Sequence, residues 1–500
     1  MLPAFLLAAT IAGRADSTLL RILAINDFHG ALEPRQYGWS AGHPVGGAAA
    51  LKATLDSAAR SCACPVLRLD GGDEMQGTLA SNLVFGRSTI EALNRFGLDA
   101  AVVGNHELDW GVDTLRARMR ESGWKWIAAN VFDSASGRRP TWATPYAMFD
   151  RGGMRVAVVG YMAGRTKQML GAREGAGLVW REGASAFRDV LETVRAERPD
   201  LTVLVAHEGA FCDSLPCRGE VIDLARQLDS TQVQLIIAGH THTLVNTVVN
   251  GIPVVQARSN GTAYSVIDLM RRSDGTRAWR ARVETVWADR VTPDSGVNVI
   301  LDRYRPMVDR LALRRVAVLR DSLPRQGNQY ALGNLIADAQ RAAASGTDFS
   351  IMNNGGIRRD LPAGQLTYSD LFELHPFGNS IVRVWLSGAQ LKELMERALI
   401  SGRPSFHISG MTVRFDSRQP AGGRVLEMRK ANGTVVRPKR TYVLALSDFL
   451  QAGGEGLAFL RTLPTHRTGK TDLDAMIAYL GRLRQPVAAP AGRRFIDVAP

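Results

Sequence analysis

The sequence predicts two α/β domains, each built from layers of sheet and helix, joined by a helix. At 500 residues the chain is too long for one ordinary hydrophobic core. Short β-branched runs alternate with amphipathic stretches, which is typical of layered α/β folds. The same alternation starts again in the second half of the chain, so we expect a second α/β unit there.

Strands of the first half are predicted where short runs are rich in β-branched residues. These runs are 19–25, 65–69, 100–103, 154–160, 201–206, 234–239 and 252–257. Amphipathic stretches such as 46–59 and 183–197 predict helices between them. The later runs "AYSVIDLMR" and "TRAWRARVETV" predict strands that extend this sheet or belong to a second one.

A connecting helix is predicted between the two halves. Its apolar residues are spaced three and four apart: Val297, Ile300, Leu301, Tyr304, Val308 and Leu311. Pro293 marks its start, and we expect a kink or an interruption at Pro306. The predicted organisation is a first domain over 18–290, a linker helix over 291–313 and a C-terminal domain over 314–500.

The chain is basic, with 61 Lys and Arg against 48 Asp and Glu and a net charge of +13. Such a surface can attract nucleic acid, an anionic membrane or phosphorylated small molecules. The arginines are scattered and form no dense run, which favours a solvated surface over a nucleic-acid groove. We therefore expect no nucleic-acid partner, and we expect a monomer.

The first residues, "MLPAFLLAATIAGRADS", predict a signal peptide over 1–15. Its apolar core is too short to cross a bilayer, and no later stretch is suited to doing so, so stable membrane insertion is not expected. The four cysteines form two close pairs. A Cys212–Cys217 disulfide fits an exported protein, whereas a Cys62–Cys64 disulfide would be strained. The predicted location is the periplasm or the cell exterior.

Five polar stretches directly follow predicted strands. They are "INDFHG" (Asp27, His29), "LDGGDE" (Asp73), "VGNHELD" (Asn105, His106, Asp109), "VAHEG" (His207) and "IIAGHTH" (His240, His242). In a sheet of largely common direction, they would meet at its carboxyl edge, where open α/β sheets bind ligands. One such histidine alone could be a core or surface residue, but five of the 9 histidines lie in these stretches.

The shared chemistry of these stretches is oxygen plus imidazole without thiolate, which suits two divalent ions such as Zn, Mn or Fe. In Asp27-x-His29 and His240-x-His242, alternate side chains of an extended segment would point the same way. Asp73 follows two glycines, and its two oxygens could bridge two ions. A pair of ions stabilises both the attacking and the departing oxygens of an in-line displacement.

His106 is expected to act differently from the ligands. Asp109 lies three residues further on and can reach the imidazole if this segment turns helical. A carboxylate in that position raises the basicity of a histidine, which makes His106 an acid or electrostatic catalyst. The alternative is that Asp109 is only a carboxylate at a helix N-terminus.

Taken in this order, the motifs resemble those of the calcineurin-like metallophosphoesterases, and most of all the secreted bacterial 5′-nucleotidase / UDP-sugar hydrolase family. "NDFHGALEP", "GGDEMQGTLASNL" and "GNHELDWG" carry the resemblance. It implies a four-layer-type sandwich followed by a nucleotide-binding C-terminal domain. It also implies one metal site of Asp27, His29, Asp73 and His242 and another of Asp73, Asn105, His207 and His240, with His106 and Asp109 as the catalytic dyad.

In the second half, "MNNGGIR", "HPFGN" and "DFLQAGGEG" resemble the family's substrate-binding motifs. The resemblance assigns Asn353 to the base, Arg358 to phosphate, and Phe377 and Phe449 to stacking on the base, although without their glycine-rich neighbours both phenylalanines could be core residues. Glu455 stands where relatives commonly have Asp, so its side chain is one methylene longer. Arg325 is the nearest candidate for a second phosphate-binding arginine.

The expected function is release of phosphate from nucleoside 5′-monophosphates, with two divalent metals and a metal-bound hydroxide as nucleophile. Two activities on the same scaffold compete with it: 2′,3′-cyclic-nucleotide phosphodiesterase/3′-nucleotidase and UDP-sugar hydrolase. A nucleotide-binding surface protein without catalysis is the non-enzyme alternative, and it predicts lost ligands, whereas all candidate positions are present.

Overall fold

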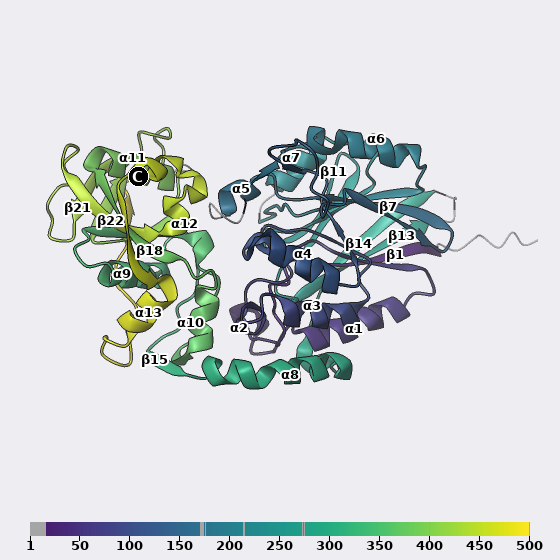
Figure 1. Ribbon diagram of the computed structural model, residues 1–500, viewed down its shortest axis with the longest axis horizontal. Coiled ribbons are helices and arrows are strands. Elements are labelled where there is room, and N and C mark those ends of the chain that lie inside the picture. Colours follow the sequence, from purple (N-terminus) through teal and green to yellow (C-terminus); the bar gives the residue numbers. More distant parts are fainter. Residues whose placement is uncertain are drawn as a thin grey trace, which may run out of the picture.

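The computed structural model describes residues 17–499, except 171–174, 176, 214–215, 273, 275 and 400. The predicted signal peptide lies outside the described residues. Figure 1 shows two lobes: an N-terminal lobe holding β1 to β14 and a C-terminal lobe holding β15 to β24, with one long helix along the lower edge.

The N-terminal lobe contains two six-stranded sheets. The first has the order β14 (Arg277–Thr285), β13 (Ala263–Arg271), β1 (Ser17–Ile25), β2 (Val66–Asp70), β3 (Ala100–Val102) and β4 (Lys125–Ile127). The second has the order β11 (Leu244–Val249), β12 (Ile252–Ala257), β10 (Leu235–Ala238), β9 (Leu201–Ala206), β7 (Met154–Tyr161) and β6 (Tyr146–Arg151). Within each sheet the central strands run parallel, from β1 to β4 and from β12 to β7.

The two sheets pack face to face and are covered by helices on their outer sides. Buried aliphatic residues from both sheets, such as Ile22, Leu69 and Val203, form one core cluster between them. The helices α1 (Ala48–Arg60), α3 (Arg87–Leu93) and α4 (Gly111–Glu121) cover the first sheet, and α6 (Arg188–Ala196) and α7 (Glu220–Arg226) cover the second (Figure 1). This is the expected four-layer α/β sandwich. The expectation that the motifs follow one sheet is wrong, because the strands divide between two.

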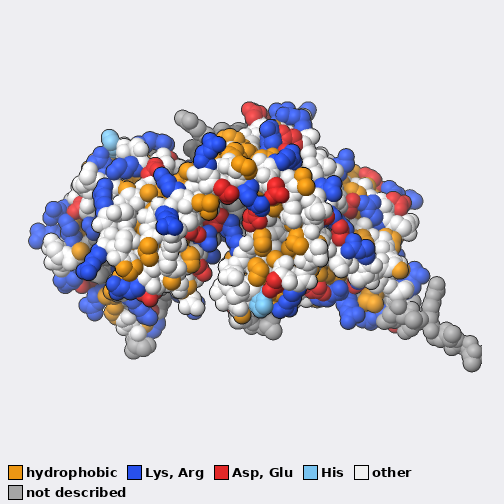
Figure 2. All heavy atoms as spheres, turned by 90° about the horizontal axis from the view of Figure 1, so that it is seen from below, with side chains coloured by type: hydrophobic (Ala, Val, Ile, Leu, Met, Phe, Trp, Pro, Cys, Tyr) orange, Lys and Arg blue, Asp and Glu red, His pale blue; other side chains and the backbone are white. Residues whose placement is uncertain are grey.

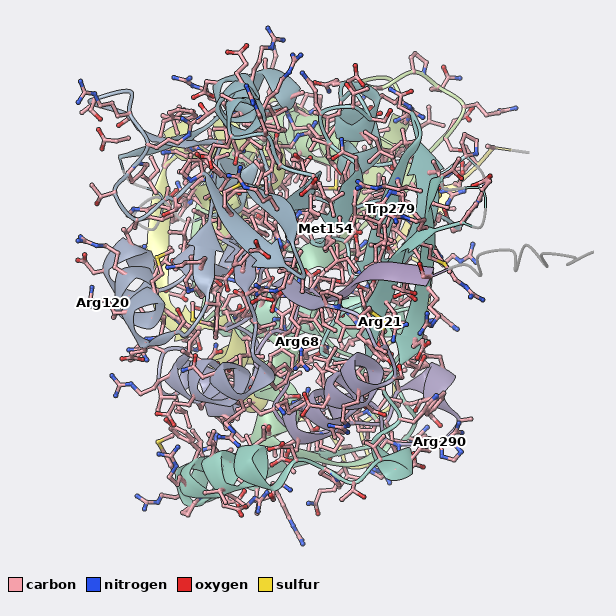
Figure 3. The ribbon with its side chains drawn as sticks, turned by 90° about the vertical axis from the view of Figure 1, so that its right-hand side faces the viewer. Arg21, Arg68, Arg120, Met154, Trp279 and Arg290 are labelled. Atoms are coloured by element: carbon pink, nitrogen blue, oxygen red, sulfur yellow. A yellow bond between two sulfur atoms is a disulfide. The ribbon has the colours of Figure 1, made fainter. Side chains whose placement is uncertain are left out.

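A buried arginine ties three elements of the first layers together. Arg21, labelled in Figure 3, donates two parallel hydrogen bonds from β1 to Asp268 on β13, at 2.7 and 2.9 Å. It also donates to the carbonyl of Ala58 in α1 at 2.8 Å. A guanidinium that satisfies a carboxylate bidentately can be buried at low cost, so this contact fixes the helix against the sheet.

The C-terminal lobe is a second α/β unit, as expected. Its main sheet has the order β19 (Phe406–Ser409), β16 (Phe349–Asn353), β22 (Thr441–Ser447), β18 (Ser380–Ser387) and β23 (Thr465–Thr471). A three-stranded sheet pairs β20 (Met411–Phe415) with β21 (Val425–Lys430) on one side and β24 (Phe495–Asp497) on the other, and a two-stranded sheet pairs β15 (Arg315–Leu319) with β17 (Gly364–Thr367). The helices are α9 (Ala331–Ala343), α10 (Tyr368–Leu374), α11 (Gly388–Ala398), α12 (Asp448–Gln451) and α13 (Asp472–Leu480).

The helix between the lobes is α8 (Ser295–Ala312), which starts after Pro293 as expected. Asp294 caps it by accepting the N–H of Val297 at 2.9 Å. The expected interruption at Pro306 is wrong, because the helix continues through this residue. Its apolar face packs Val297 and Leu301 into the core of the N-terminal lobe.

Both cysteine pairs are disulfides, Cys62–Cys64 and Cys212–Cys217. The second is the pair that was expected, and the bond between Cys62 and Cys64 forms as well. None of the described helices has a stretch suited to spanning a bilayer. Figure 2 shows Lys and Arg side chains spread among Asp and Glu over one face of the molecule, and they form no single stripe there.

Candidate metal centre

The polar motifs of the N-terminal lobe converge at the carboxyl ends of strands from both sheets. Asp27 and His29 follow β1, Asp73 follows β2, and Asn105 follows β3. The second sheet contributes His207 after β9 and His240 and His242 after β10. All of these side chains are buried or half-buried. The gathering of the motifs at a carboxyl edge was predicted, and the edge is shared by two facing sheets.

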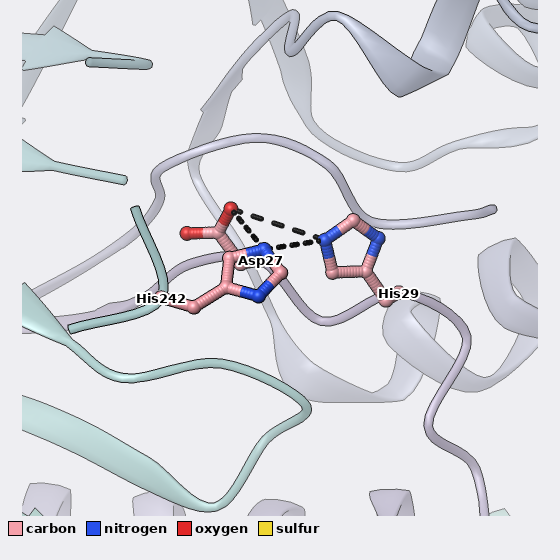
Figure 4. A group of neighbouring side chains, drawn as sticks. All are labelled: Asp27, His29 and His242. Carbon is pink, nitrogen blue, oxygen red and sulfur yellow. Dashed lines mark hydrogen bonds and ion pairs between the residues drawn. The ribbon is translucent and has the colours of Figure 1, made fainter. Parts of the chain in front are cut away.

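The first group of candidate ligands is Asp27, His29 and His242 (Figure 4). The Nε2 atoms of the two imidazoles lie 3.0 Å apart. The Asp27 Oδ1 atom lies 3.4 Å from Nε2 of His242 and 4.0 Å from Nε2 of His29. Three donor atoms thus face a common point from two different sheets.

The second group is Asp73, His207 and His240. The Nε2 atom of His207 lies 3.1 Å from Asp73 Oδ2 and 3.2 Å from the amide oxygen of Asn105. Asp73 also lies near the first group, since its Oδ2 atom is 3.9 Å from Nε2 of His29. Asp73 is therefore the carboxylate that lies near both groups.

The donor set fits divalent ions. Ligand atoms around a tetrahedral ion with bonds of about 2.0–2.1 Å lie roughly 3.3 Å apart, close to the separations in both groups. Two imidazoles are also held by their other nitrogen: Nδ1 of His29 lies 2.7 Å from the carbonyl of Gln76, and Nδ1 of His207 lies 2.7 Å from that of Gly71. Such bonds fix the tautomer that leaves Nε2 as a ligand.

The backbone at the candidate ligands is unusual. Five of them have positive φ: Asp27 (50°), His29 (51°), Asp73 (60°), His240 (74°) and His242 (58°). Non-glycine residues rarely adopt this conformation, and it is concentrated at functional sites. The expectation that Asp27-x-His29 and His240-x-His242 are extended is therefore wrong. Their side chains converge through tight left-handed turns and not through strand alternation.

Charges within the cluster balance one another. Burial alone would keep the Asp27 carboxyl neutral, but attraction to His242 lowers the pKa of Asp27 to about 2. Burial likewise disfavours a charged His207, but the Asp73 carboxylate raises the pKa of His207 to about 10. Burial and the nearby His207 lower the pKa of His240 to about 3. Among these groups, His207 provides the positive charge that stabilises the buried Asp73 carboxylate, whereas His240 is neutral.

The predicted dyad has the expected contact, with Nδ1 of His106 2.9 Å from Oδ2 of Asp109. Burial disfavours the charged imidazole, but the carboxylates of Asp109 and Asp73 outweigh it and raise the pKa of His106. The backbone N–H of His106 donates to Asp73 Oδ1 at 2.9 Å. His106 and Asp109 thus lie directly beside the two groups of ligands.

The sequence reasoning missed a role for Glu107, which is fully buried behind the site. Its carboxylate accepts backbone N–H groups from two loops: those of Asp73, Glu74 and Gly104 at 2.8–2.9 Å and that of Met75 at 3.4 Å. The signal was present in "GNHE", where a glutamate directly follows the candidate catalyst. A glutamate alone does not show which N–H groups it meets.

The C-terminal lobe places its predicted residues against this centre. Nη2 of Arg358 lies 3.5 Å from Nε2 of His29, and burial lowers the pKa of this arginine. The ring of Phe377 stacks on His106, with centroids 5.4 Å apart and planes at 22°. Asn353 donates to Glu455 Oε1 at 2.7 Å, so these two predicted nucleoside contacts are neighbours.

The other two predicted substrate residues, Phe449 and Arg325, have contacts within the C-terminal lobe. Phe449 packs on the core of the C-terminal lobe, and its ring lies where a side chain at Gly454 would otherwise be. The guanidinium of Arg325 binds Asp360 at 3.0 Å and the carbonyl of Ile357 at 2.8 Å. Arg325 therefore supports the turn that leads to Arg358, and its charge is already paired.

A two-sheet α/β sandwich with a buried Asp/His/Asn cluster defines a metal-dependent phosphoesterase, and comparisons with known proteins agree. The family model "5′-nucleotidase, C-terminal domain" matches residues 314–462. A second model, "Bacterial capsule synthesis protein PGA_cap", matches residues 27–268. Residues 314–462 therefore match the 5′-nucleotidase C-terminal domain, the chain as a whole is similar to 5′-nucleotidases, and it is a metal-dependent phosphoesterase.

Several relatives match over nearly the whole chain. A 5′-nucleotidase of Vibrio cholerae is 27% identical over 96% of this chain and 94% of its own length. A protein of Bacillus subtilis named Endonuclease YhcR is 28% identical over 94% of this chain, which spans only 40% of that relative. The crystal structure of a 5′-nucleotidase precursor from Thermus thermophilus matches with a TM-score of 0.86 and 27% identity, covering 96% of this chain and 100% of that one.

Proposed function

We propose that the protein hydrolyses nucleoside 5′-monophosphates outside the cytoplasm, releasing inorganic phosphate and a nucleoside. The proposal rests on one contact between the lobes: Arg358 of the C-terminal lobe lies 3.5 Å from the candidate ligand His29 of the N-terminal lobe. A phosphate group between them would contact both lobes. The names of the relatives, 5′-nucleotidase and cell wall protein among them, support the activity and the location.

Two divalent ions, Zn, Mn or similar, would occupy the two groups. Asp27, His29 and His242 would hold one ion; Asn105, His207 and His240 would hold the other; and Asp73 would contact both. When bound, such ions act as Lewis acids and lower the pKa of a water ligand, which supplies the nucleophile. The predicted division of the chain assigns this chemistry to 18–290 and substrate selection to 314–500, on either side of the 291–313 helix.

The remaining residues act on the substrate. Arg358 binds the phosphate oxygens and balances the negative charge of the phosphoryl group in the transition state. His106, held by Asp109, stabilises the same charge from the other lobe. Asn353 and Glu455 contact the nucleoside, and Phe377 and Phe449 offer rings to the base, a contact that tolerates any base. Arg325 supports the phosphate-binding turn through Asp360.

A phosphodiester substrate is the second candidate. It is favoured by the relative named an endonuclease, which is 28% identical over most of this chain. The same cluster could cleave a diester, since an in-line displacement at phosphorus has the same charge demands.

The test is hydrolysis of a panel of substrates by the purified protein loaded with Mn²⁺ or Zn²⁺, with the products separated by chromatography and inorganic phosphate measured. The panel contains AMP, UMP, UDP-glucose, 2′,3′-cyclic AMP and a short DNA oligonucleotide. We expect kcat/KM to be highest for the 5′-monophosphates and activity to disappear with EDTA and return with metal. A diester hydrolysed faster than AMP would replace the proposal by the second candidate.

A further inference from the structure

Glu373, at the end of α10 (Tyr368–Leu374), lies in the seam between the lobes with its side chain almost fully buried. Each carboxylate oxygen meets a different arginine. Oε1 lies 2.5 Å from Nη2 of Arg35, in the N-terminal lobe, and Oε2 lies 2.5 Å from Nη1 of Arg359, in its own lobe. One carboxylate thus connects two lobes.

The two arginines lie next to functional residues in the chain. Arg35 belongs to the loop after β1 that also holds His29, and its backbone is fixed by paired hydrogen bonds with Val45, at 2.7 and 3.0 Å. Arg359 directly follows Arg358, the proposed phosphate ligand. Glu373 therefore bridges the loop of a metal ligand and the turn that binds phosphate.

The charges at this bridge favour the connection. The Arg35 side chain is three-quarters buried, and its desolvation disfavours the charge. Attraction to Glu373 overcomes this cost and keeps the pKa of Arg35 above its usual value. Arg359 also pairs with Asp370 at 3.2 Å. Two carboxylates, Glu373 and Asp370, therefore balance the charges of the two arginines.

Other contacts along the seam place the same segments together. The carbonyl of Pro376 accepts from Gln76 at 3.3 Å and from Asn82 at 3.1 Å, both in the N-terminal lobe. The next residue, Phe377, stacks on His106. The end of α10 and the segment after it therefore contact the N-terminal lobe at several points, and Phe377 reaches the metal centre.

We infer that Glu373 is a positioning residue: held between Arg35 and Arg359, it sets how closely Arg358 and Phe377 approach the metal centre, and so how tightly the nucleotide is bound. The inference rests on the proposed function. The side-chain hydrogen bonds of Glu373 among the described residues go to Arg35, Arg359 and Ser369, and none goes to a candidate ligand or a proposed substrate contact.

The test uses the full-length metal-loaded protein with Arg35→Gln, Arg35→Lys, Glu373→Gln and the double variant Arg35→Gln/Glu373→Gln. We expect Arg35→Gln to raise KM for AMP about tenfold, the change that corresponds to about 1.4 kcal/mol. The kcat value should change much less, because the metal centre is intact. Arg35→Lys keeps the charge and should restore most of the affinity. The double variant should have a KM no higher than that of Glu373→Gln, because Arg35 and Glu373 act through the same contact.

Glu33→Gln is the matched control. Glu33 lies two residues from Arg35 and pairs at 3.2 Å with Arg305 on α8, and both side chains are half exposed. We expect this variant to leave KM unchanged. Small-angle X-ray scattering of the substrate-free proteins gives a measure independent of activity: Arg35→Gln should increase the radius of gyration, and Glu33→Gln should not.

Three results would overturn the inference: a lower melting temperature with unchanged KM, equal losses in Arg35→Gln and Glu33→Gln, or a loss confined to kcat. The proposed function fails separately, when the wild-type protein does not hydrolyse AMP. The scattering comparison and kcat for p-nitrophenyl phosphate then still report on the position of the lobes and on the metal centre.

Discussion

Replacing Glu107 by Gln tests whether this buried carboxylate holds the loops of the metal centre in place. The glutamate accepts two N–H groups at each carboxylate oxygen: those of Asp73 and Gly104 at Oε2, and those of Glu74 and Met75 at Oε1. The amide has one oxygen, so one pair of N–H groups must face an NH₂ group. We expect the amide to keep its oxygen on Asp73 and Gly104, where the distances are 2.9 and 2.8 Å.

The size of the effect follows from the bonds that are lost. Glu74 N–H donates at 2.9 Å and Met75 N–H at 3.4 Å, so one strong and one weak bond disappear. A hydrogen bond to a charged group contributes about 1.5–3 kcal/mol, which makes about 3 kcal/mol a reasonable total. For a lobe of this size, that corresponds to a fall of roughly 6–12 °C in Tm. Because the loop of Asp73 shifts, metal affinity should fall about 10- to 100-fold.

The assay is metal titration by calorimetry together with thermal unfolding, with Glu396→Gln as control. Glu396 is also buried and accepts two backbone N–H groups, from Arg424 at 3.0 Å and Val425 at 2.7 Å, but in the C-terminal lobe. Its variant should lower Tm and leave metal affinity unchanged. Equal metal affinities in the wild type and Glu107→Gln would refute the reasoning.

Three further variants test other parts of the site. His106→Ala should lower kcat for AMP about 10²- to 10⁴-fold with unchanged metal content, measured by steady-state kinetics and elemental analysis; an unchanged kcat would remove His106 from catalysis. Gly104→Ala should lose metal binding in calorimetry, because the added carbon would lie 2.2 Å from Asp73 Oδ1; normal binding would show that the loop can move. Glu455→Ala should raise KM for AMP with little change in kcat, because Asn353 loses its partner at 2.7 Å; a fall in kcat alone would contradict a role in nucleoside binding.

Local patterns predicted the central strands of both sheets but not the edge strands β4, β6 and β11. The predicted run 201–206 is β9 (Leu201–Ala206), and 252–257 is β12 (Ile252–Ala257). The division into two sheets could not be predicted from these runs, because a buried strand is apolar on both faces whichever sheet it joins. Only the long-range pairing of β1 with β2, and of β9 with β10, separates the layers.

The identity of the clustered residues could also be predicted, but their geometry could not. Asp27 and His29 were expected on an extended segment and instead lie in left-handed turns. Such turns depend on contacts with other loops, which the local sequence does not contain. The same holds for Glu373, whose partner Arg35 is 338 positions away in the chain.

The left-handed turns at the candidate ligands are stabilised by hydrogen bonds between loops that follow different strands. Each non-glycine residue in this conformation costs about 1–2 kcal/mol, so five of them cost as much as a large part of a domain's stability. The cost is offset by interlocking: Asp27 N–H donates to Gly72, and His29 N–H donates to Asp73, at 2.8 and 2.9 Å. The carboxylate of Asp27 in turn accepts the N–H of His240 from the other sheet at 2.9 Å. These three candidate ligand loops therefore position one another, so the geometry of the site depends on both sheets.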